Sequence, residues 1–321
     1  MSRVIEKTYN GFIKKKDVAS FIKFFSVLTW EKIGFVRRQR RLKFHEVTVT
    51  QNLLFQFRIL SEAFPTTVEM FEAIDEKTNG NDIELFIKTR EGYVFFACQA
   101  KIAHKSKTGI YTSIEHPTGP KAKKIRQQIE SLIDYAEDAP AIKTGLKKGI
   151  PIYLFYNYSD DVNTLSAVQS TTTDDVEVYG CSYVDARELV GATYYNSPHW
   201  IRKPSFTLLH PKMGKPFYTL FNYLGKPQAD LLRSFLSPSD SVKANSESGI
   251  SDLAVYQRPQ LDNRDSDYWV PIRTALANEQ LTNSTQVRVA NEEQGPEFNP
   301  KYRIVFGDST IDASIIKWLF M

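Results

Sequence analysis

Apolar residues recur every three or four positions in three segments of the chain, as is typical of helices with one buried face. These segments are residues 17–38, 48–63 and 121–138. Lysine or arginine closes the first, where a cation complements the negative end of the helix dipole. The buried face of the third helix is predicted to consist of Ile125, Ile129, Leu132, Ile133 and Ala136.

Shorter apolar runs between these segments predict strands. Residues 82–89 and 93–101 are joined by three residues that include a glycine, which predicts a β-hairpin. The run at 152–158 is apolar on both faces, which indicates a strand in the buried centre of a sheet. Two further strands are predicted over 176–184 and 302–306.

The order of helix, hairpin, helix and buried strand predicts a mixed α/β core, a mixed β-sheet flanked by helices. Residues 237–251 are polar and are expected to form a linker. The predicted division is therefore a basic helical region at 1–43, a main domain at 44–236, the linker at 237–251, and a smaller C-terminal α/β region of unknown role at 252–321.

Composition excludes several classes of protein. Hydrophobic residues make up 42% of the chain and charged residues 24%, so it is neither disordered nor collagen-like. The two cysteines form no CxxC pair, which excludes a disulfide framework and a zinc ribbon. Neither a membrane-spanning run nor a secretory leader is found, so we expect a cytoplasmic protein without a membrane partner. The phosphate-binding, dinucleotide-binding and hydrolase motifs GxxxxGK[ST], GxGxxG and GxSxG do not occur.

Positive charge is concentrated in the first half of the chain. The whole chain carries +4, whereas residues 1–50 contain 12 Lys or Arg against 4 Asp or Glu, and residues 101–150 contain 10 against 5. Residues 238–321 are acidic, with 8 against 12. The distribution is expected of a protein that binds a polyanion through its N-terminal half. Solvated basic helix faces are the alternative interpretation.

The predicted hairpin gathers polar residues that carry chemistry. Asp82 and Glu84 are two residues apart on one strand, and Gln99 and Lys101 are two apart on the other, so each pair shares a face. Pairing across the turn brings Asp82 and Glu84 opposite Gln99 and Lys101. Carboxylate and amide oxygens are ligands that Mg²⁺ prefers, and an ammonium can orient water and stabilise negative charge. The patch therefore suits phosphodiester hydrolysis with Mg²⁺ or Mn²⁺. Alternatively, Asp82 caps a turn and Glu84 is a solvent-facing strand residue.

These residues resemble a known family. Asp82 followed by Gln99-Ala-Lys101 is similar to the PD-(D/E)XK restriction-endonuclease-like nucleases, in the variant with glutamine in place of an acid. The likeness extends over roughly residues 44–158 and includes Gly80-Asn-Asp-Ile-Glu84 and the strand after Ile150. It implies that the domain at 44–236 has a restriction-endonuclease-like fold.

The resemblance also implies roles for further residues. Glu46, at the entrance to the helix at 48–63, would be an additional acidic metal ligand beside Asp82, Glu84 and Gln99. Gln128, on the apolar face of the helix at 121–138, would join the catalytic group. Tyr135 lies on the same face and is expected to pack. Six basic residues would approach the phosphates of the nucleic acid: Lys105, Lys107, Lys121, Lys123, Lys124 and Arg126.

The leading hypothesis is a metal-dependent nuclease acting on DNA in bacterial anti-phage defence or genome maintenance. Lys101 would orient or activate the attacking water. A catalytically inactive nucleic-acid-binding module on the same fold remains open, because Gln99 lacks the negative charge of an acid. A homodimer or a partner protein of a defence system is compatible with the sequence, as is a protein-interaction role for the acidic C-terminal part.

Overall fold

The computed structural model describes most of the first 235 residues and two short segments beyond them. The described residues are 3–39, 42, 44–64, 66–73, 82–104, 109–115, 117–118, 126–138, 149–197, 199–210, 212–235, 269–271 and 302–311. Of Asp82 and Arg126 only the backbone is described. The predicted linker at 237–251 lies outside this part of the chain.

A mixed sheet forms the centre of the molecule. Its eight described strands lie in the order β8-β7-β6-β3-β2-β10-β1-β9. Neighbouring strands are antiparallel except β2 with β10 and β3 with β6, which are parallel. The bounds are β1 Val68–Ala73, β2 Asp82–Lys88, β3 Tyr93–Ile102, β6 Ile150–Tyr156, β7 Cys181–Asp185, β8 Lys215–Pro216, β9 Trp269–Pro271 and β10 Tyr302–Phe306. A separate two-stranded ladder pairs β4 Pro117–Thr118 with β5 Arg126–Gln127.

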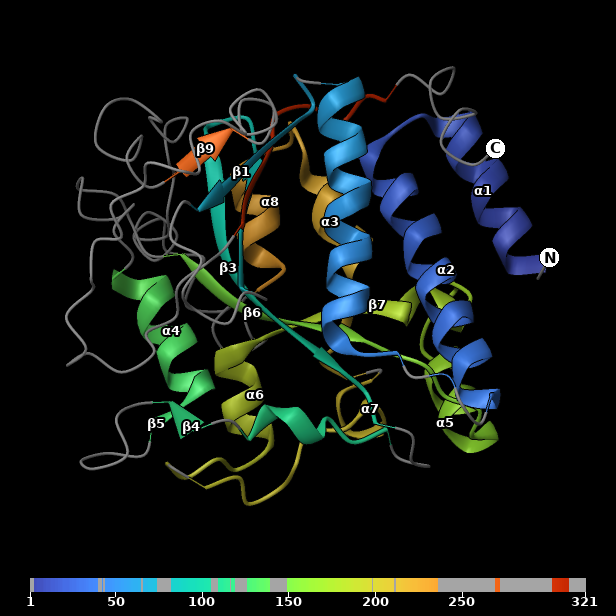
Figure 1. The fold of residues 1–321 in the computed structure, drawn as a ribbon, viewed down its shortest axis with the longest axis vertical. Coiled ribbons are helices and arrows are strands. Elements are labelled where there is room, and N and C mark those ends of the chain that lie inside the picture. The colour runs from blue at the N-terminus through green and yellow to red at the C-terminus, as the bar shows by residue number, and fades with distance from the viewer. Residues whose placement is uncertain are drawn as a thin grey trace, which may run out of the picture.

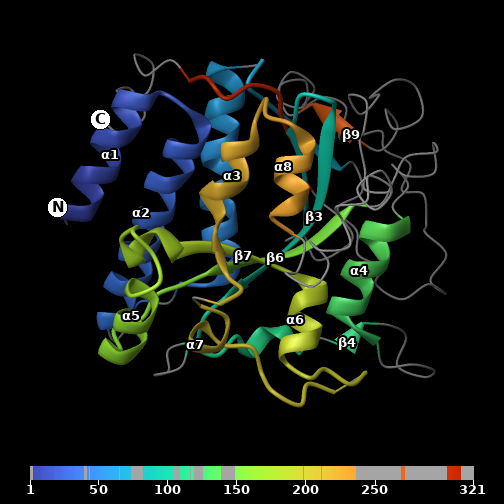
Figure 2. The ribbon, with the colours of Figure 1, turned by 180° about the vertical axis from the view of Figure 1, so that it is seen from behind.

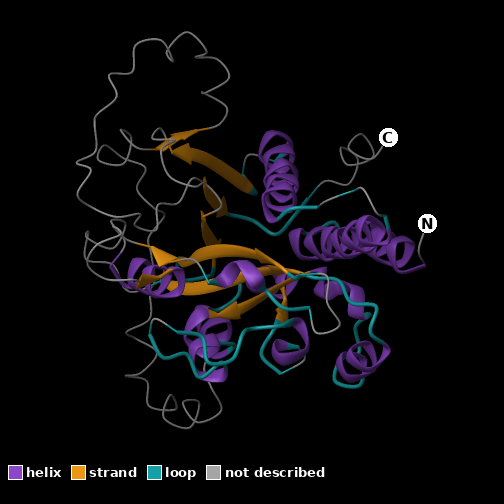
Figure 3. Cartoon of the chain, turned by 60° about the horizontal axis from the view of Figure 1, so that its bottom comes forward, coloured by secondary structure: helices purple, strands orange, loops and turns teal. Residues whose placement is uncertain are grey.

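Helices cover both faces of this sheet, which confirms the predicted α/β class (Figures 1 and 3). On one face, α2 and α3 pack against the strands, and α1 packs against α2. On the other face α4 contacts β3 and β6, and α6 contacts β6 and β7, as Figure 2 shows from behind. The bounds are α1 Arg3–Lys15, α2 Val18–Arg38, α3 Glu46–Ala63, α4 Gln128–Asp138, α5 Val162–Gln169, α6 Ala186–Ala192, α7 Phe206–Leu209 and α8 Gln228–Arg233, with 3₁₀ turns η1 Thr112–Ile114, η3 Val176–Gly180 and η4 Phe217–Tyr223.

The predicted separation of the C-terminal region is wrong for its last strand. β10 lies between β1 and β2, so residues 302–306 belong to the main sheet (Figure 1). Ile304 and Phe306 are fully buried, and the Phe306 ring packs against Phe57 of α3 and Phe221 of η4. The apolar strand therefore completes the core of the domain predicted over 44–236.

The predicted basic N-terminal region also contributes to the core. The helix expected over 17–38 is confirmed as α2, and the Asp17 side chain caps it by accepting from the Ser20 N–H at 2.7 Å. Helix α2 approaches η3 so closely that a Cβ at Gly180 would lie 2.0 Å from the Ser26 carbonyl oxygen. Only glycine permits this contact.

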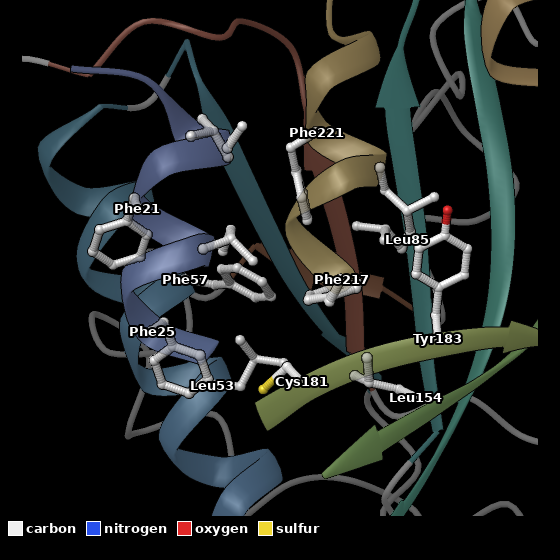
Figure 4. Close-up of a cluster of buried hydrophobic side chains, with 14 of the residues drawn as sticks. Phe21, Phe25, Leu53, Phe57, Leu85, Leu154, Cys181, Tyr183, Phe217 and Phe221 are labelled. Carbon is white, nitrogen blue, oxygen red and sulfur yellow. The ribbon is translucent and has the colours of Figure 1, made fainter. Parts of the chain in front are cut away.

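The larger hydrophobic cluster lies between the sheet and helices α2 and α3. Figure 4 shows Phe57 of α3 directed toward η4 and labels Leu53 of α3 and Phe25 of α2 in the same cluster. Phe21 of α2 packs against Phe12 of α1. Leu85 and Leu154 contribute from β2 and β6, and Cys181 and Tyr183 from β7. Burial of so much apolar surface fixes these helices against the sheet.

The predicted strands are found with small shifts. The hairpin is confirmed as β2 and β3, and the strand at 152–158 is confirmed as β6, which spans Ile150–Tyr156 and is buried throughout. The strand predicted over 176–184 is wrong in its first half, because residues 176–180 form the 3₁₀ turn η3 before β7 begins. The close packing of this turn on α2 favours it over an extended chain.

A chain of hydrogen bonds runs through the interior beside β6 and β7. Tyr111 donates to Asn157 Oδ1 (2.5 Å), and Asn157 Nδ2 donates to Ser182 Oγ (2.8 Å). Ser182 Oγ lies 2.9 Å from His210 Nε2, and His210 Nδ1 lies 3.1 Å from the Phe206 carbonyl oxygen. Because a carbonyl can only accept, Nδ1 carries a proton. Ser182 Oγ already accepts from Asn157, which leaves its hydroxyl hydrogen to donate to Nε2, and burial lowers the pKa of His210 to about 4, so the ring is neutral near pH 7.

None of the described helices combines the length and the apolar character that crossing a membrane requires.

Candidate active site

The hairpin places Asp82 and Gln99 at directly paired positions. In the antiparallel register Asp82 is opposite Gln99 and Glu84 is opposite Ala97. The predicted partnership of Glu84 with Gln99 or Lys101 is therefore displaced by two residues, because the tight turn at 89–92 sets the register. Lys101 lies two residues beyond Gln99, which pairs with Asp82, the first residue of β2.

Gln99 and Lys101 are buried polar residues within an otherwise apolar strand. Each is 2% exposed, and alternation along β3 places both on the sheet face covered by α4. A buried ammonium and a buried amide are costly unless they meet polar partners. Two such residues at the end of one strand therefore mark a specialised polar site.

Helix α4 supplies a partner for Gln99. Gln128 Nε2 donates to Gln99 Oε1 at 2.9 Å, which confirms that the glutamine predicted on the apolar face of this helix meets a polar partner. The other Gln128 side-chain atom, Oε1, is buried and has no hydrogen-bond partner among the described residues. A donor from a water or a substrate would satisfy it.

The helix predicted over 121–138 begins later than expected, at Gln128. Arg126 and Gln127 form β5, and residues 121–125 lie outside the described part. The Glu130 side chain accepts from the Gln127 N–H at 3.1 Å, half of a capping box that fixes the first turn at this point. Basic residues before Gln128 would also be unfavourable inside the positive N-terminal end of a helix.

Glu84 makes an ion pair in the core. It is 1% exposed, its Oε2 accepts from Arg303 Nε at 2.6 Å, and its Oε1 accepts from the Tyr135 hydroxyl. The solvent-facing alternative is therefore wrong. Both carboxylate oxygens accept from protein donors and Arg303 balances the charge, so Glu84 is the acid of an ion pair in this structure, and its predicted metal and catalytic roles stay predictions.

Glu46 is the first residue of α3 and is half-buried. The Tyr156 phenol has a pKa raised well above its usual value, chiefly by burial and further by nearby Cys181 and Glu46. Tyr156 pairs with Ile102, and both belong to the hydrophobic cluster on the sheet face that α3 covers. Gln99 and Lys101 are on the other face, toward α4, so Glu46 lies at the same end of β3 but approaches from the opposite face.

Most of the predicted phosphate-contacting residues cannot be placed. Arg126 lies in β5, next to the start of α4. The other five, Lys105, Lys107, Lys121, Lys123 and Lys124, lie outside the described residues.

Two of the predicted metal ligands, Asp82 and Gln99, carry oxygen atoms of the kind that bind a hard cation. Asp82 and Gln99, at paired positions, offer a carboxylate and an amide oxygen, the ligand types that Mg²⁺ takes while keeping several of its own waters. Among the described side chains, no three His, Cys, Asp or Glu residues gather as a metal-binding group. Asp82, Gln99 and Glu46 therefore stay predicted ligands of Mg²⁺, and of these the register pairs Asp82 with Gln99.

Arg303 was not among the predicted site residues, and Tyr135 was expected only to pack. Both bind Glu84, one from the last strand and the other from α4. A signal was available: Glu84 lies between Ile83 and Leu85, and Arg303 precedes Ile304, so charges of opposite sign interrupt the apolar residues of two predicted strands. A charge at a buried strand position requires a counter-charge.

Comparison with known proteins places the chain in a family. It matches the family of unknown function DUF6615 over residues 18–296, a range that includes the hairpin, α4 and the predicted linker. No curated protein and no solved structure matches the chain. The protein belongs to the DUF6615 family.

Proposed function

We propose that this protein is a metal-dependent nuclease that hydrolyses phosphodiester bonds in DNA. The observation that carries the proposal is the polar end of β3. Lys101 is buried two residues beyond Gln99, and Gln99 is paired with Asp82 across the hairpin and hydrogen-bonded to Gln128 of α4. The resemblance to restriction-endonuclease-like nucleases implies an acid, a Q-x-K strand and a following helix, and these contacts support the proposal.

Each residue of this group has a chemical use in phosphodiester hydrolysis. Asp82, Gln99 and Glu46 would hold Mg²⁺, which when bound polarises a phosphoryl oxygen and acidifies a bound water. Lys101 places a positive charge where negative charge develops in the transition state, in a region that excludes bulk water. The free acceptor atom of Gln128, Oε1, is available to orient a water beside Gln99.

A second candidate is a nucleic-acid-binding module that does not cleave. One observation favours it: Gln99 supplies a neutral oxygen that already accepts from Gln128, and Glu84 is neutralised by Arg303. The cation-binding group therefore has fewer carboxylates than the pattern at 82–101 predicts. Such a module would bind nucleic acid without a requirement for metal.

The test is a cleavage assay on labelled single- and double-stranded DNA and RNA, plain and methylated, with Mg²⁺, Mn²⁺ or EDTA. We expect metal-dependent cleavage of DNA by the parent protein. Lys101→Met removes the charge while keeping much of the side-chain length, and should slow cleavage at least about 100-fold while changing nucleic-acid binding little. Lys215→Met, which changes a half-buried lysine on the distant strand β8, is the matched control and should cleave like the parent.

The parent protein and Gln99→Glu, compared side by side, distinguish the two candidates. In an active nuclease this change adds a carboxylate ligand and should preserve or raise cleavage, most clearly at limiting metal. A parent that is silent on every substrate, together with a cleaving Gln99→Glu variant, would favour the inactive module. Equal rates for the parent and Lys101→Met would show that this hairpin is not the active site.

A further inference from the structure

Arg303, Glu84 and Tyr135 form a polar cluster next to the candidate active site, because Glu84 lies two residues along β2 from Asp82. Arg303 and Glu84 are direct partners in the parallel register of β10 and β2, and their side chains meet at 2.6 Å. The Tyr135 hydroxyl of α4 donates to the second carboxylate oxygen. Three elements, the last strand, the hairpin and α4, therefore meet at one carboxylate.

Helix α4 thus makes two polar contacts with the sheet. Gln128 and Tyr135 are seven residues apart, which places them two turns apart on the same face. Their partners are also close on the sheet, because Glu84 pairs with Ala97 and Gln99 is two residues further along β3. Both hydrogen bonds therefore tie the same face of α4 to the β2–β3 hairpin.

The apolar contacts of α4 fix its position along the helix axis less closely than these two hydrogen bonds do. Ile129, Leu132 and Ala136 are fully buried in the cluster between α4 and the sheet. Contacts of this kind are non-directional, so they tolerate small shifts along the helix axis. Hydrogen bonds weaken steeply with distance and angle, and a bond to a charged carboxylate is among the strongest. The bond from Tyr135 to Glu84 is therefore suited to setting the register of α4.

We propose that Tyr135 and Arg303 are positioning residues for Gln99. Arg303 fixes the carboxylate of Glu84, Glu84 fixes Tyr135, and α4 then holds Gln128 at hydrogen-bonding distance from Gln99. The last strand of the chain thereby sets the geometry of a candidate catalytic residue on the hairpin. The consequence for cleavage rests on the proposed nuclease function, whereas the coupling itself does not.

The variant that tests this coupling is Tyr135→Phe, which removes only the hydroxyl and leaves the ion pair intact. The matched control is Tyr218→Phe. Tyr218 donates to Asp174, which also pairs with Lys23 at 2.6 Å, so the control loses the same kind of bond on the other face of the sheet. Side-chain amide NMR signals of Gln99 and Gln128 report the coupling without reference to activity. They should move in Tyr135→Phe and stay unchanged in Tyr218→Phe.

Cleavage kinetics test the catalytic consequence. Tyr135→Phe should lower kcat about tenfold to 100-fold at unchanged KM, because a small misplacement of an active-site group has effects of this size. In a Gln128→Ala background the same change should have no further effect on kcat, since the coupling acts through Gln128. A role limited to stability would instead lower the unfolding midpoint equally in both backgrounds and leave kcat unchanged.

The outcomes separate this inference from the proposed function. Glutamine signals that do not move in Tyr135→Phe would overturn the inference, whether or not the protein cleaves. A parent that cleaves no substrate while the signals do move would reject the nuclease proposal and support the coupling. Additive effects of Tyr135→Phe and Gln128→Ala on kcat would overturn the route through Gln128.

Discussion

Replacing Arg303 by methionine would leave the Glu84 carboxylate buried without its cation. The two side chains are 3% and 1% exposed, so solvent cannot screen the remaining charge. Removing one partner of a buried ion pair costs about 3–5 kcal/mol. Because whole domains are stable by only about 5–15 kcal/mol, we expect a large fall in the free energy of unfolding. Methionine fills similar volume, so the effect measures charge rather than a cavity.

Urea denaturation followed by tryptophan fluorescence measures this loss without adding salt. The double variant Glu84→Gln/Arg303→Met removes both charges and keeps an acceptor for the Tyr135 hydroxyl, so it should recover most of the lost stability. Arg233→Met is the control. Its partner is Asp230 at 3.5 Å, and both side chains are largely exposed, so the expected change is within about 0.5 kcal/mol.

Two results would refute this reasoning. A loss below about 1 kcal/mol for Arg303→Met would mean that Glu84 is solvated, contrary to a buried ion pair. A double variant no more stable than the single one would show that the cost comes from packing of β10 rather than from the uncompensated carboxylate. The contrast between the two variants therefore isolates the charge.

The sequence predicts the hairpin well because its determinants are local. The alternation of apolar and polar residues, the strand lengths and a glycine-containing turn predict that β2 pairs with β3. The predicted partners of Glu84 differ from the observed one by two residues. The burial of β6 follows from its continuous apolar run. The helical period likewise places Gln128 on the buried face of α4, although the helix begins later than the period suggests.

The position of β10 could not be predicted in the same way. Arg303 and Glu84 are 219 residues apart in sequence, and no local pattern specifies which strands will be neighbours. The polar segment at 237–251 favoured a boundary, whereas burial of Ile304 and Phe306 requires the strand to return to the sheet. The role of Glu84 was misassigned for this reason: its partner lies on a strand that was assigned to another region.

Two further predictions concern charge and proton binding. Replacing the four basic residues of 121–126 by alanine should weaken nucleic-acid binding irrespective of sequence and flatten its salt dependence, because fewer counterions are released; an unchanged slope in a salt titration would place the nucleic acid elsewhere. Burial lowers the pKa of His210 from 6.5 to about 4, so the folded state resists a proton that the unfolded state accepts. The contribution of neutral His210 to the free energy of unfolding is complete above pH 6.5. It falls by about 3 kcal/mol as the pH drops to 4, since each pKa unit corresponds to about 1.4 kcal/mol. Urea unfolding across this range should show the decline in the parent and in His199→Gln, which changes an exposed histidine, and a weaker decline in His210→Gln. An equal decline in all three proteins would mean that other groups cause it and that the bond between His210 and Ser182 does not hold the imidazole neutral.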